Sequence, residues 1–229
     1  MLDFCIIGSG VSGSTIAHIL SKKYNVEIFD KAKGLGGRSS NKRFIKKQSF
    51  DHGVQYISPK SKEFKKFIQF LYKKKEMKIW DGNHLDLTFE KKENNIKFIG
   101  KKGNNVISKY YTKKIRKNFQ SQVKSINYNK HFWEIKLNTE KIVKARSVIF
   151  TCPYPQLKKI ARKYLDKKGI QTQVHYQQPM SKMKMFDTGQ EMPNSEKFCT
   201  NVLSLPIHPF LKKQEVLYVC KCIGEYYGI

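Results

Sequence analysis

The chain has 229 residues, which is long enough for one substantial hydrophobic core or two small ones. Its formal net charge of +27 would suit nucleic acid, but only five of its 45 basic residues are arginine and the lysines are scattered along the chain. We therefore predict no specific binding of nucleic acid. We also predict no membrane span, because no apolar run approaches the roughly 18 residues that a span needs.

A glycine-rich turn follows the first apolar run. Asp3–Ile7 is typical of a buried parallel strand, and a helix is expected to begin near Val11. The glycines between them have G-x-G-x-x-G spacing: the first permits a tight turn, the second lets a pyrophosphate approach the backbone, and the third lets the helix pack on the strand. Free N–H groups at the start of that helix favour phosphate. The residues predicted to bind a dinucleotide here are Gly8, Gly10, Val11, Ser12 and Gly13.

An acidic residue follows the second predicted strand, Asn25–Phe29. Asp30 lies about 20 residues after the glycine turn, which is the distance at which an acid binds the ribose hydroxyl of a dinucleotide. Its carboxylate would also repel a 2′-phosphate. The turn and the acid together predict FAD or NAD(P).

A second glycine-rich segment, Lys31–Arg38, follows directly. Gly36 and Gly37 would let backbone N–H groups crowd a phosphate, and Arg38 could clamp phosphate oxygens with its guanidinium fork. We include Lys31 among the cofactor contacts. A third segment, Phe50–Tyr56, reads F-D-H-G-V-Q-Y and adds another glycine turn flanked by polar groups.

With these segments the chain resembles the flavin-dependent amine-oxidase superfamily, and above all the renalase-like branch of FAD/NAD(P)-binding oxidoreductases. The resemblance covers about residues 1–165 and is most specific before residue 56. It implies FAD as cofactor, with NAD(P) as substrate or alternative dinucleotide. It also implies a small-molecule substrate that gives a hydride to the flavin, with oxygen as acceptor.

The resemblance also assigns expected contacts. Gln55 and Tyr56 would lie near the isoalloxazine ring, and Val123 would belong to a hairpin that touches the adenine. His52 is a candidate proton carrier, although a turn residue with a structural hydrogen bond is the interpretation we favour. These catalytic assignments remain open. Asn104 stands where the family usually has Met.

The family pattern stops before the end of the chain. No glycine after Gly103 is followed by Asp, so the late Gly-Asp pair that closes the flavin site is not found. Residues 169–229 instead resemble the C-terminal segment of DegT/DnrJ/EryC1/StrS aminotransferases, with His175 and Tyr176 matching an H-Y segment near the sugar substrate. That family holds pyridoxal phosphate (PLP) through a lysine of a large domain that is not found here, so PLP is not expected to bind. The alternative function is thus a PLP-dependent sugar aminotransferase fragment that is inactive alone.

The predicted fold class is α/β. We expect a Rossmann-like FAD/NAD(P)-binding domain over residues 1–165, with β-rich stretches near 78–99 and 123–150 and a partial substrate-side region at 58–120. Residues 169–229 are expected to read strand, helix, short strand, helix, as a small α+β segment. Without the family's closing strand, the first strand would keep an open edge that could pair with another chain. Five scattered cysteines indicate a reducing cytoplasm and no metal site.

Overall fold

The computed structural model describes residues 1–44, 49–81, 96–175, 177–183, 185, 189 and 191–227. The chain divides into two compact units. The front unit contains residues 2–121 and 148–151, and the rear unit contains residue 1, 122–147 and 152–229. Each unit is described by itself.

The front unit is built on parallel strands. β1 (Leu2–Ile7) pairs with β2 (Val26–Phe29) in parallel register, and β2 pairs in parallel with β7 (Arg116–Asn118). On its other side β1 has the end of β10 (Ile142–Phe150) as neighbour, and the N–H of Thr151 just beyond donates to Ile7 O at 2.8 Å. The open edge predicted at the first strand is therefore wrong, because residues 148–151 cover it.

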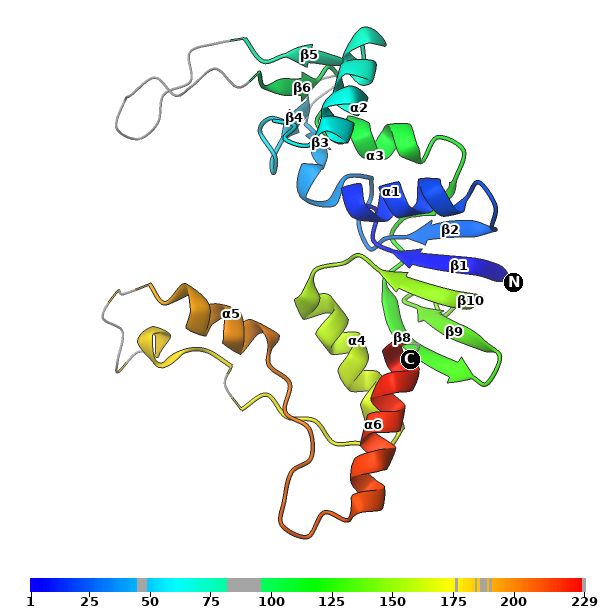
Figure 1. Cartoon of the computed structure of the whole chain (residues 1–229), viewed down its shortest axis with the longest axis vertical. Helices are drawn as coiled ribbons and strands as arrows, with labels where there is room; N and C mark the ends of the chain where they lie inside the picture. Colours follow the sequence, from blue (N-terminus) through cyan, green and yellow to red (C-terminus); the bar gives the residue numbers. More distant parts are fainter. Residues whose placement is uncertain are drawn as a thin grey trace. The chain divides into compact units, whose positions relative to one another are not determined.

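The first helix covers the strands with a small apolar core. α1 (Val11–Leu20) begins directly after the glycine turn, as predicted, and Ala17 is fully buried with Ile6 and Ile28. α1 lies beside α3 (Val106–Tyr111), as Figure 1 shows, and the rings of His18 and Tyr111 are 4.9 Å apart. These contacts hold the glycine turn at the end of the β1 strand.

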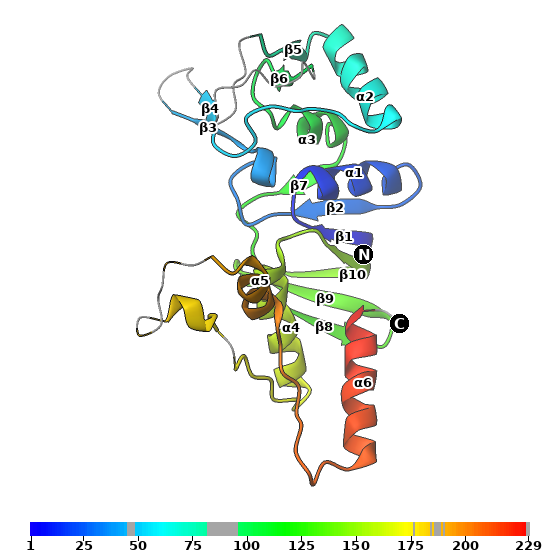
Figure 2. The same cartoon turned by 60° about the vertical axis from the view of Figure 1, so that its left-hand side comes forward.

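A second core lies under α2 (Lys62–Lys73), whose start is capped by Ser61. The helix contacts an antiparallel pair, β5 (Met77–Ile79) with β6 (Phe98–Gly100), visible in Figures 1 and 2. Its apolar face supplies Ile68 and Leu71, which are fully buried. A short hairpin joins β3 (Asn41–Arg43) to β4 (Ser49–Asp51). Most of the β-rich stretch predicted near 78–99 lies outside the described residues.

The rear unit begins with an antiparallel meander. β8 (Val123–Asn129) pairs with β9 (Phe132–Leu137), and β9 pairs with the first half of β10, which confirms the β-rich stretch predicted over 123–150. α4 (Tyr154–Lys167) and α6 (Lys213–Tyr227) contact each other. Tyr164 of α4 is only 1% exposed, with its ring 5.3 Å from that of Tyr226. The short helical turn Met180–Lys182 and α5 (Pro193–Asn201) complete the unit.

The strands predicted after residue 168 shrink to a single bridge in the described part of the tail. Gln173 and Ser204 exchange two backbone hydrogen bonds of 3.1 and 2.8 Å, and pairing goes no further. Prolines such as Pro206 and Pro209 lack the N–H that a longer ladder needs. Two side chains beside them are largely exposed, Ile207 at 92% and Phe210 at 85%.

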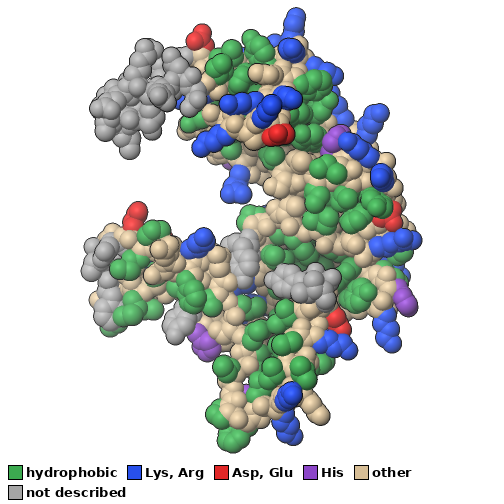
Figure 3. Space-filling model, in the orientation of Figure 1, with side chains coloured by type: hydrophobic (Ala, Val, Ile, Leu, Met, Phe, Trp, Pro, Cys, Tyr) green, Lys and Arg blue, Asp and Glu red, His purple; other side chains and the backbone are tan. Residues whose placement is uncertain are grey.

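Basic side chains are spread over many elements on the face that Figure 3 shows. This distribution agrees with the scattered lysines of the sequence. In the described part of the chain, no helix has the length and apolar character needed to cross a membrane.

Candidate functional site

The fold itself requires two of the three glycines in the first turn. Gly8 has a positive φ of 110°, which L side chains rarely adopt. A Cβ atom on Gly13 would lie 2.1 Å from the carbonyl oxygen of Gly8 and 2.6 Å from the hydroxyl of Thr151. Thr151 closes the turn from behind by donating its hydroxyl to Ile7 O and Gly8 O, both at 3.1 Å. Sequence analysis did not identify this threonine as part of the site.

Gly10 is different, because nothing in the described protein requires glycine there. Its φ of −67° suits any residue, and a Cβ would meet no atom closer than 3.9 Å. The space beside it is the space that a pyrophosphate would fill. Gly10 is the N-cap residue of α1, and no side chain caps the helix there. The next residues, Val11 and Ser12, are exposed, and their backbone N–H groups have no partner within the helix. These N–H groups are therefore available to a ligand or to water.

The carboxylate of Asp30 is held in place by the same turn. Ser9 donates its N–H and its hydroxyl to Oδ2, both at 2.6 Å, and the N–H of Ala32 donates to Oδ1 at 2.8 Å. A carboxylate has about four acceptor positions, so these three bonds leave room for a ribose hydroxyl. Ser9 is fully buried, and the sequence analysis assigned it no role.

The second glycine segment touches the first. Gly10 and Gly36 form a parallel bridge, and the N–H of Gly36 donates to Ser9 O at 3.1 Å. A Cβ on Gly37 would lie 3.2 Å from the Cα of Gly10. Both glycines of the second segment have positive φ, 122° and 54°. The structure thus brings the two predicted phosphate-binding segments together with Asp30.

A pocket of about 490 Å³ lies next to this junction. It is lined by Gly37, Arg38, Ser40, His52, Gly53 and Val54. Arg38 is exposed, and its carbonyl oxygen accepts from the N–H of Val54 at 3.0 Å. Gly53 must be glycine, because a Cβ there would lie 1.9 Å from Arg38 O.

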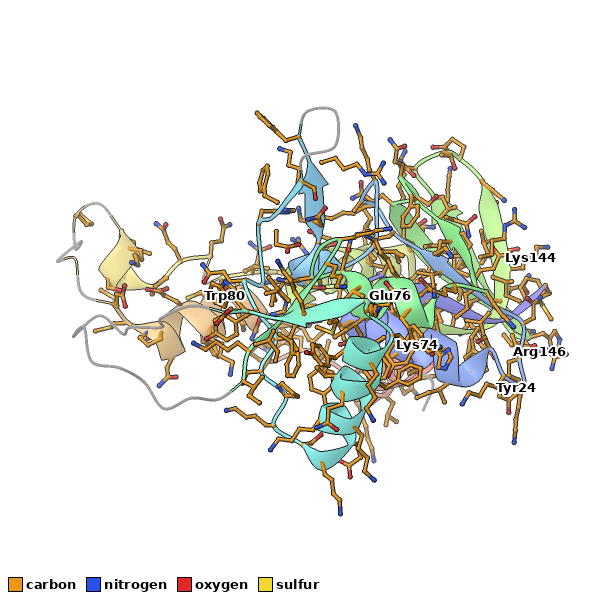
Figure 4. The ribbon with its side chains drawn as sticks, turned by 90° about the horizontal axis from the view of Figure 1, so that it is seen from above. Tyr24, Lys74, Glu76, Trp80, Lys144 and Arg146 are labelled. Carbon is orange, nitrogen blue, oxygen red and sulfur yellow. The ribbon has the colours of Figure 1, made fainter. Side chains whose placement is uncertain are left out.

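Among the candidate catalytic residues, His52 lines this pocket. His52 is exposed and its Nε2 lies 3.2 Å from the hydroxyl of Ser40, while its role stays a prediction. Gln55 and Tyr56 are exposed. Tyr56 stacks on Trp80, with 5.3 Å between ring centroids; Trp80 is labelled in Figure 4, just beyond β5.

Two other residues, Lys31 and Val123, are predicted cofactor contacts. Lys31 is exposed beside Asp30. Val123 is buried in β8 of the rear unit, whereas the other predicted contacts belong to the front unit. Their roles stay predictions.

Comparison with known families divides the chain in a similar way. Residues 6–71 match the NAD(P)-binding Rossmann-like domain, which covers both glycine segments and Asp30. Residues 109–224, about half of the chain, match the DegT/DnrJ/EryC1/StrS aminotransferase family. Through these residues the chain belongs to the DegT/DnrJ/EryC1/StrS aminotransferase family. The aminotransferase match begins within α3, well before residue 169 where the sequence analysis placed it.

This member of the DegT/DnrJ/EryC1/StrS family is similar to a curated relative and to solved structures. The relative is the dTDP-3-amino-3,6-dideoxy-alpha-D-galactopyranose transaminase of Aneurinibacillus thermoaerophilus, 37% identical over 65 residues, which are 28% of this chain and 18% of that protein. Wild-type putrescine oxidase bound to putrescine superimposes with a TM-score of 0.52 at 12% identity, over 69% of this chain and 60% of that one. A triple mutant of the same oxidase gives 0.55 at 11% identity, over 69% and 59%.

These likenesses confirm the α/β fold with a Rossmann-like core. The chain spans about 60% of the oxidase structures and 18% of the transaminase. The front of the chain therefore has a Rossmann-like fold and is similar to NAD(P)-binding domains over residues 6–71, and residues 109–224 represent an aminotransferase family only in part.

Proposed function

We propose that the front unit binds FAD and that the chain derives from an FAD-dependent oxidoreductase of the amine-oxidase type. The observation that carries this proposal is the junction of Gly10 with Gly36 and Gly37. At this junction the backbone leaves a space that a side chain on Gly10 could occupy without meeting protein atoms. Because the fold does not require glycine at position 10, the absence of a side chain there supports a ligand that approaches the backbone closely.

The residues present fit a flavin dinucleotide in its adenosine and pyrophosphate half. Asp30, fixed by Ser9, would accept a hydrogen bond from the ribose. The start of α1 and the Gly36–Arg38 segment would bind the pyrophosphate, Arg38 through its guanidinium group. Gln55 and Tyr56 would lie on the flavin side, beside the pocket lined by Gly53 and Val54.

Bound FAD would supply the capacity to take a hydride from a reduced small-molecule substrate and to pass the electrons to oxygen. The protein's share is to bind and orient the cofactor. His52, bonded to Ser40, would line the pocket and hold its shape rather than move a proton. NAD(P) is the second dinucleotide to consider, since the family match covers NAD(P)-binding domains.

Titration of the purified chain with FAD, NAD⁺ and NADP⁺ tests the proposal. We expect FAD to raise the thermal midpoint and to stay bound after desalting, with a stabilisation of about 2.7 kcal/mol at 100 times Kd. A colourless protein whose melting FAD does not change would contradict FAD binding. NAD⁺ stabilisation without an FAD effect would reassign the site to NAD.

The family of residues 109–224 supports a second candidate function. The rear unit has a pocket of about 660 Å³, lined by hydrogen-bonding side chains that include Gln171, Gln173, His175, His208 and Tyr218. The chain would contribute this pocket to a PLP-dependent sugar aminotransferase only as part of a larger assembly. Tyr176, which the sequence analysis places with His175 in the H-Y segment, lies outside the described residues. Absence of any PLP-dependent absorbance or thermal shift would remove this candidate. The domain boundary at 165–169 stays a prediction.

A further inference from the structure

Asn104 is fully buried, and its side-chain amide is bonded at both ends to the backbone. Its Oδ1 accepts from the N–H of Gly100 at 2.9 Å. Its Nδ2 donates to two successive carbonyl oxygens, Val54 O at 2.8 Å and Gln55 O at 3.0 Å. Both amide hydrogens are thus used on the segment that carries Gln55.

The backbone of the same residue ties down the beginning of that segment. The N–H of Asn104 donates to Oδ1 of Asp51 at 2.9 Å, and the same oxygen accepts from Nδ2 of Asn41 at 3.1 Å. One residue therefore fixes both ends of the Asp51–Gln55 segment, which is separated from it by about 50 positions in the sequence.

The turn that presents Asn104 has little freedom to adjust. Gly103 has a φ of 105°, and a Cβ on it would lie 2.7 Å from the side chain of Asn41. A Cβ on Gly100 would lie 2.1 Å from the carbonyl oxygen of Gly103. A tight turn with this shape holds the Asn104 amide at one position relative to β6.

We propose that Asn104 is a positioning residue that sets the backbone of Val54 and Gln55 and thereby the flavin-side contact made by Gln55. This inference rests on the proposed binding of FAD. The family that the front of the chain resembles usually has methionine at this position. A methionine side chain has no N–H group to donate to the two carbonyl oxygens. The arrangement therefore depends on the asparagine of this chain.

Matched measurements of FAD and ADP affinity test the inference. ADP probes only the adenosine and pyrophosphate half of the site, to whose assigned residues Asn104 makes no hydrogen bond of its own; Arg38 is linked to Asn104 only through the backbone of Val54. Asn104→Asp keeps the size and the acceptor but removes both donors, so we expect FAD affinity to fall about tenfold with ADP affinity within about twofold of wild type. Leu71→Val, a destabilising change in the neighbouring core without hydrogen bonds to the segment, should alter neither affinity.

A second variant keeps the test independent of the stability of the Asn104→Asp protein. Gln55 is exposed, so Gln55→Ala should fold normally and lose about tenfold in FAD affinity and nothing in ADP affinity. In the double variant the loss should not exceed that of either change alone. Equal losses for FAD and ADP in Asn104→Asp, or an unchanged FAD affinity in Gln55→Ala, would overturn the inference. A wild-type chain that binds ADP but not FAD would instead overturn the proposed function.

Discussion

Ser9 donates both its N–H and its hydroxyl to one oxygen of Asp30, each at 2.6 Å. The residue between the first two glycines therefore joins the glycine turn, proposed to bind phosphate, to the acid proposed to bind the ribose. With Ala32 bonded to the other oxygen, the carboxylate is oriented before any ligand arrives. Orientation in advance lowers the entropic cost of ordering this side chain when a ligand binds.

Replacement of this acid should weaken cofactor binding. Asp30→Asn keeps the shape but removes the charge, and its amide would face the two donors of Ser9 unless it turned around. We expect FAD affinity to fall at least about tenfold, as measured by isothermal titration. Asp166→Asn, an exposed acid at the end of α4, serves as the charge-matched control and should bind like wild type. Equal affinities for the Asp30 variant and wild type would remove the acid from the site.

Gly10 and Gly13 should respond to alanine in opposite ways. Gly10→Ala meets no protein atom within 3.9 Å, so we expect the free energy of unfolding to change by less than about 1 kcal/mol while FAD binding is lost. Gly13→Ala puts a methyl group 2.1 Å from Gly8 O and should cost about 1–3 kcal/mol by overpacking. Urea unfolding and FAD titration of both variants separate the effects. A Gly10→Ala protein that binds FAD normally would show that no ligand approaches this backbone.

The local structure that the sequence predicts around the candidate site is set by local spacing. The glycine turn, α1 and Asp30 follow from residues close together in the chain. Asn104 and Thr151 could not be found this way, because their partners lie about 50 and 140 positions away and ordinary residue types carry no signal for such contacts. Ser9 had a weak signal: a serine between glycines, beside an acid that needs donors.

The errors in the fold have the same origin. The open edge expected at β1 depended on a missing family segment, whereas residues 148–151 occupy that place in the sheet. The strands expected within residues 169–229 are reduced to one bridge between Gln173 and Ser204 in the described part of the tail. A strand needs a partner ladder, and the prolines that follow Ser204 limit the ladder to one bridge.

The cysteines should differ sharply in reactivity. Cys5 is fully buried in β1, and burial, with the charge of Glu27 as a smaller cause, raises the pKa of its thiol well above the ordinary value. Cys220 is exposed on α6. Brief alkylation of the native protein near pH 8 should modify Cys220 and leave Cys5 intact until the chain is unfolded, as peptide mass spectrometry would show. Labelling of Cys5 as fast as Cys220 would mean that β1 opens readily.

Tyr164 should make the rear unit sensitive to alkaline pH. Burial raises the pKa of its phenol, and the nearby carboxylate of Glu225, which accepts its hydrogen bond at 3.3 Å, raises that pKa further. The unfolded chain therefore loses this proton at a lower pH than the folded chain does. The stabilisation is complete below about pH 10, the ordinary value for tyrosine, and is lost as pH rises above it.

Tyr164→Phe isolates this contribution from that of the other tyrosines. The variant should be less stable by about 1 kcal/mol near neutral pH, because the bond to Glu225 is lost. Its stability should then fall less steeply than that of wild type above about pH 10, since the titrating group has gone. Urea unfolding across this pH range measures both effects, with the exposed Tyr24→Phe as control. Parallel alkaline slopes for the wild type and Tyr164→Phe would show that the Tyr164 phenol ionises equally in the folded and unfolded chains, and hence that the contact between α4 and α6 does not hold its proton.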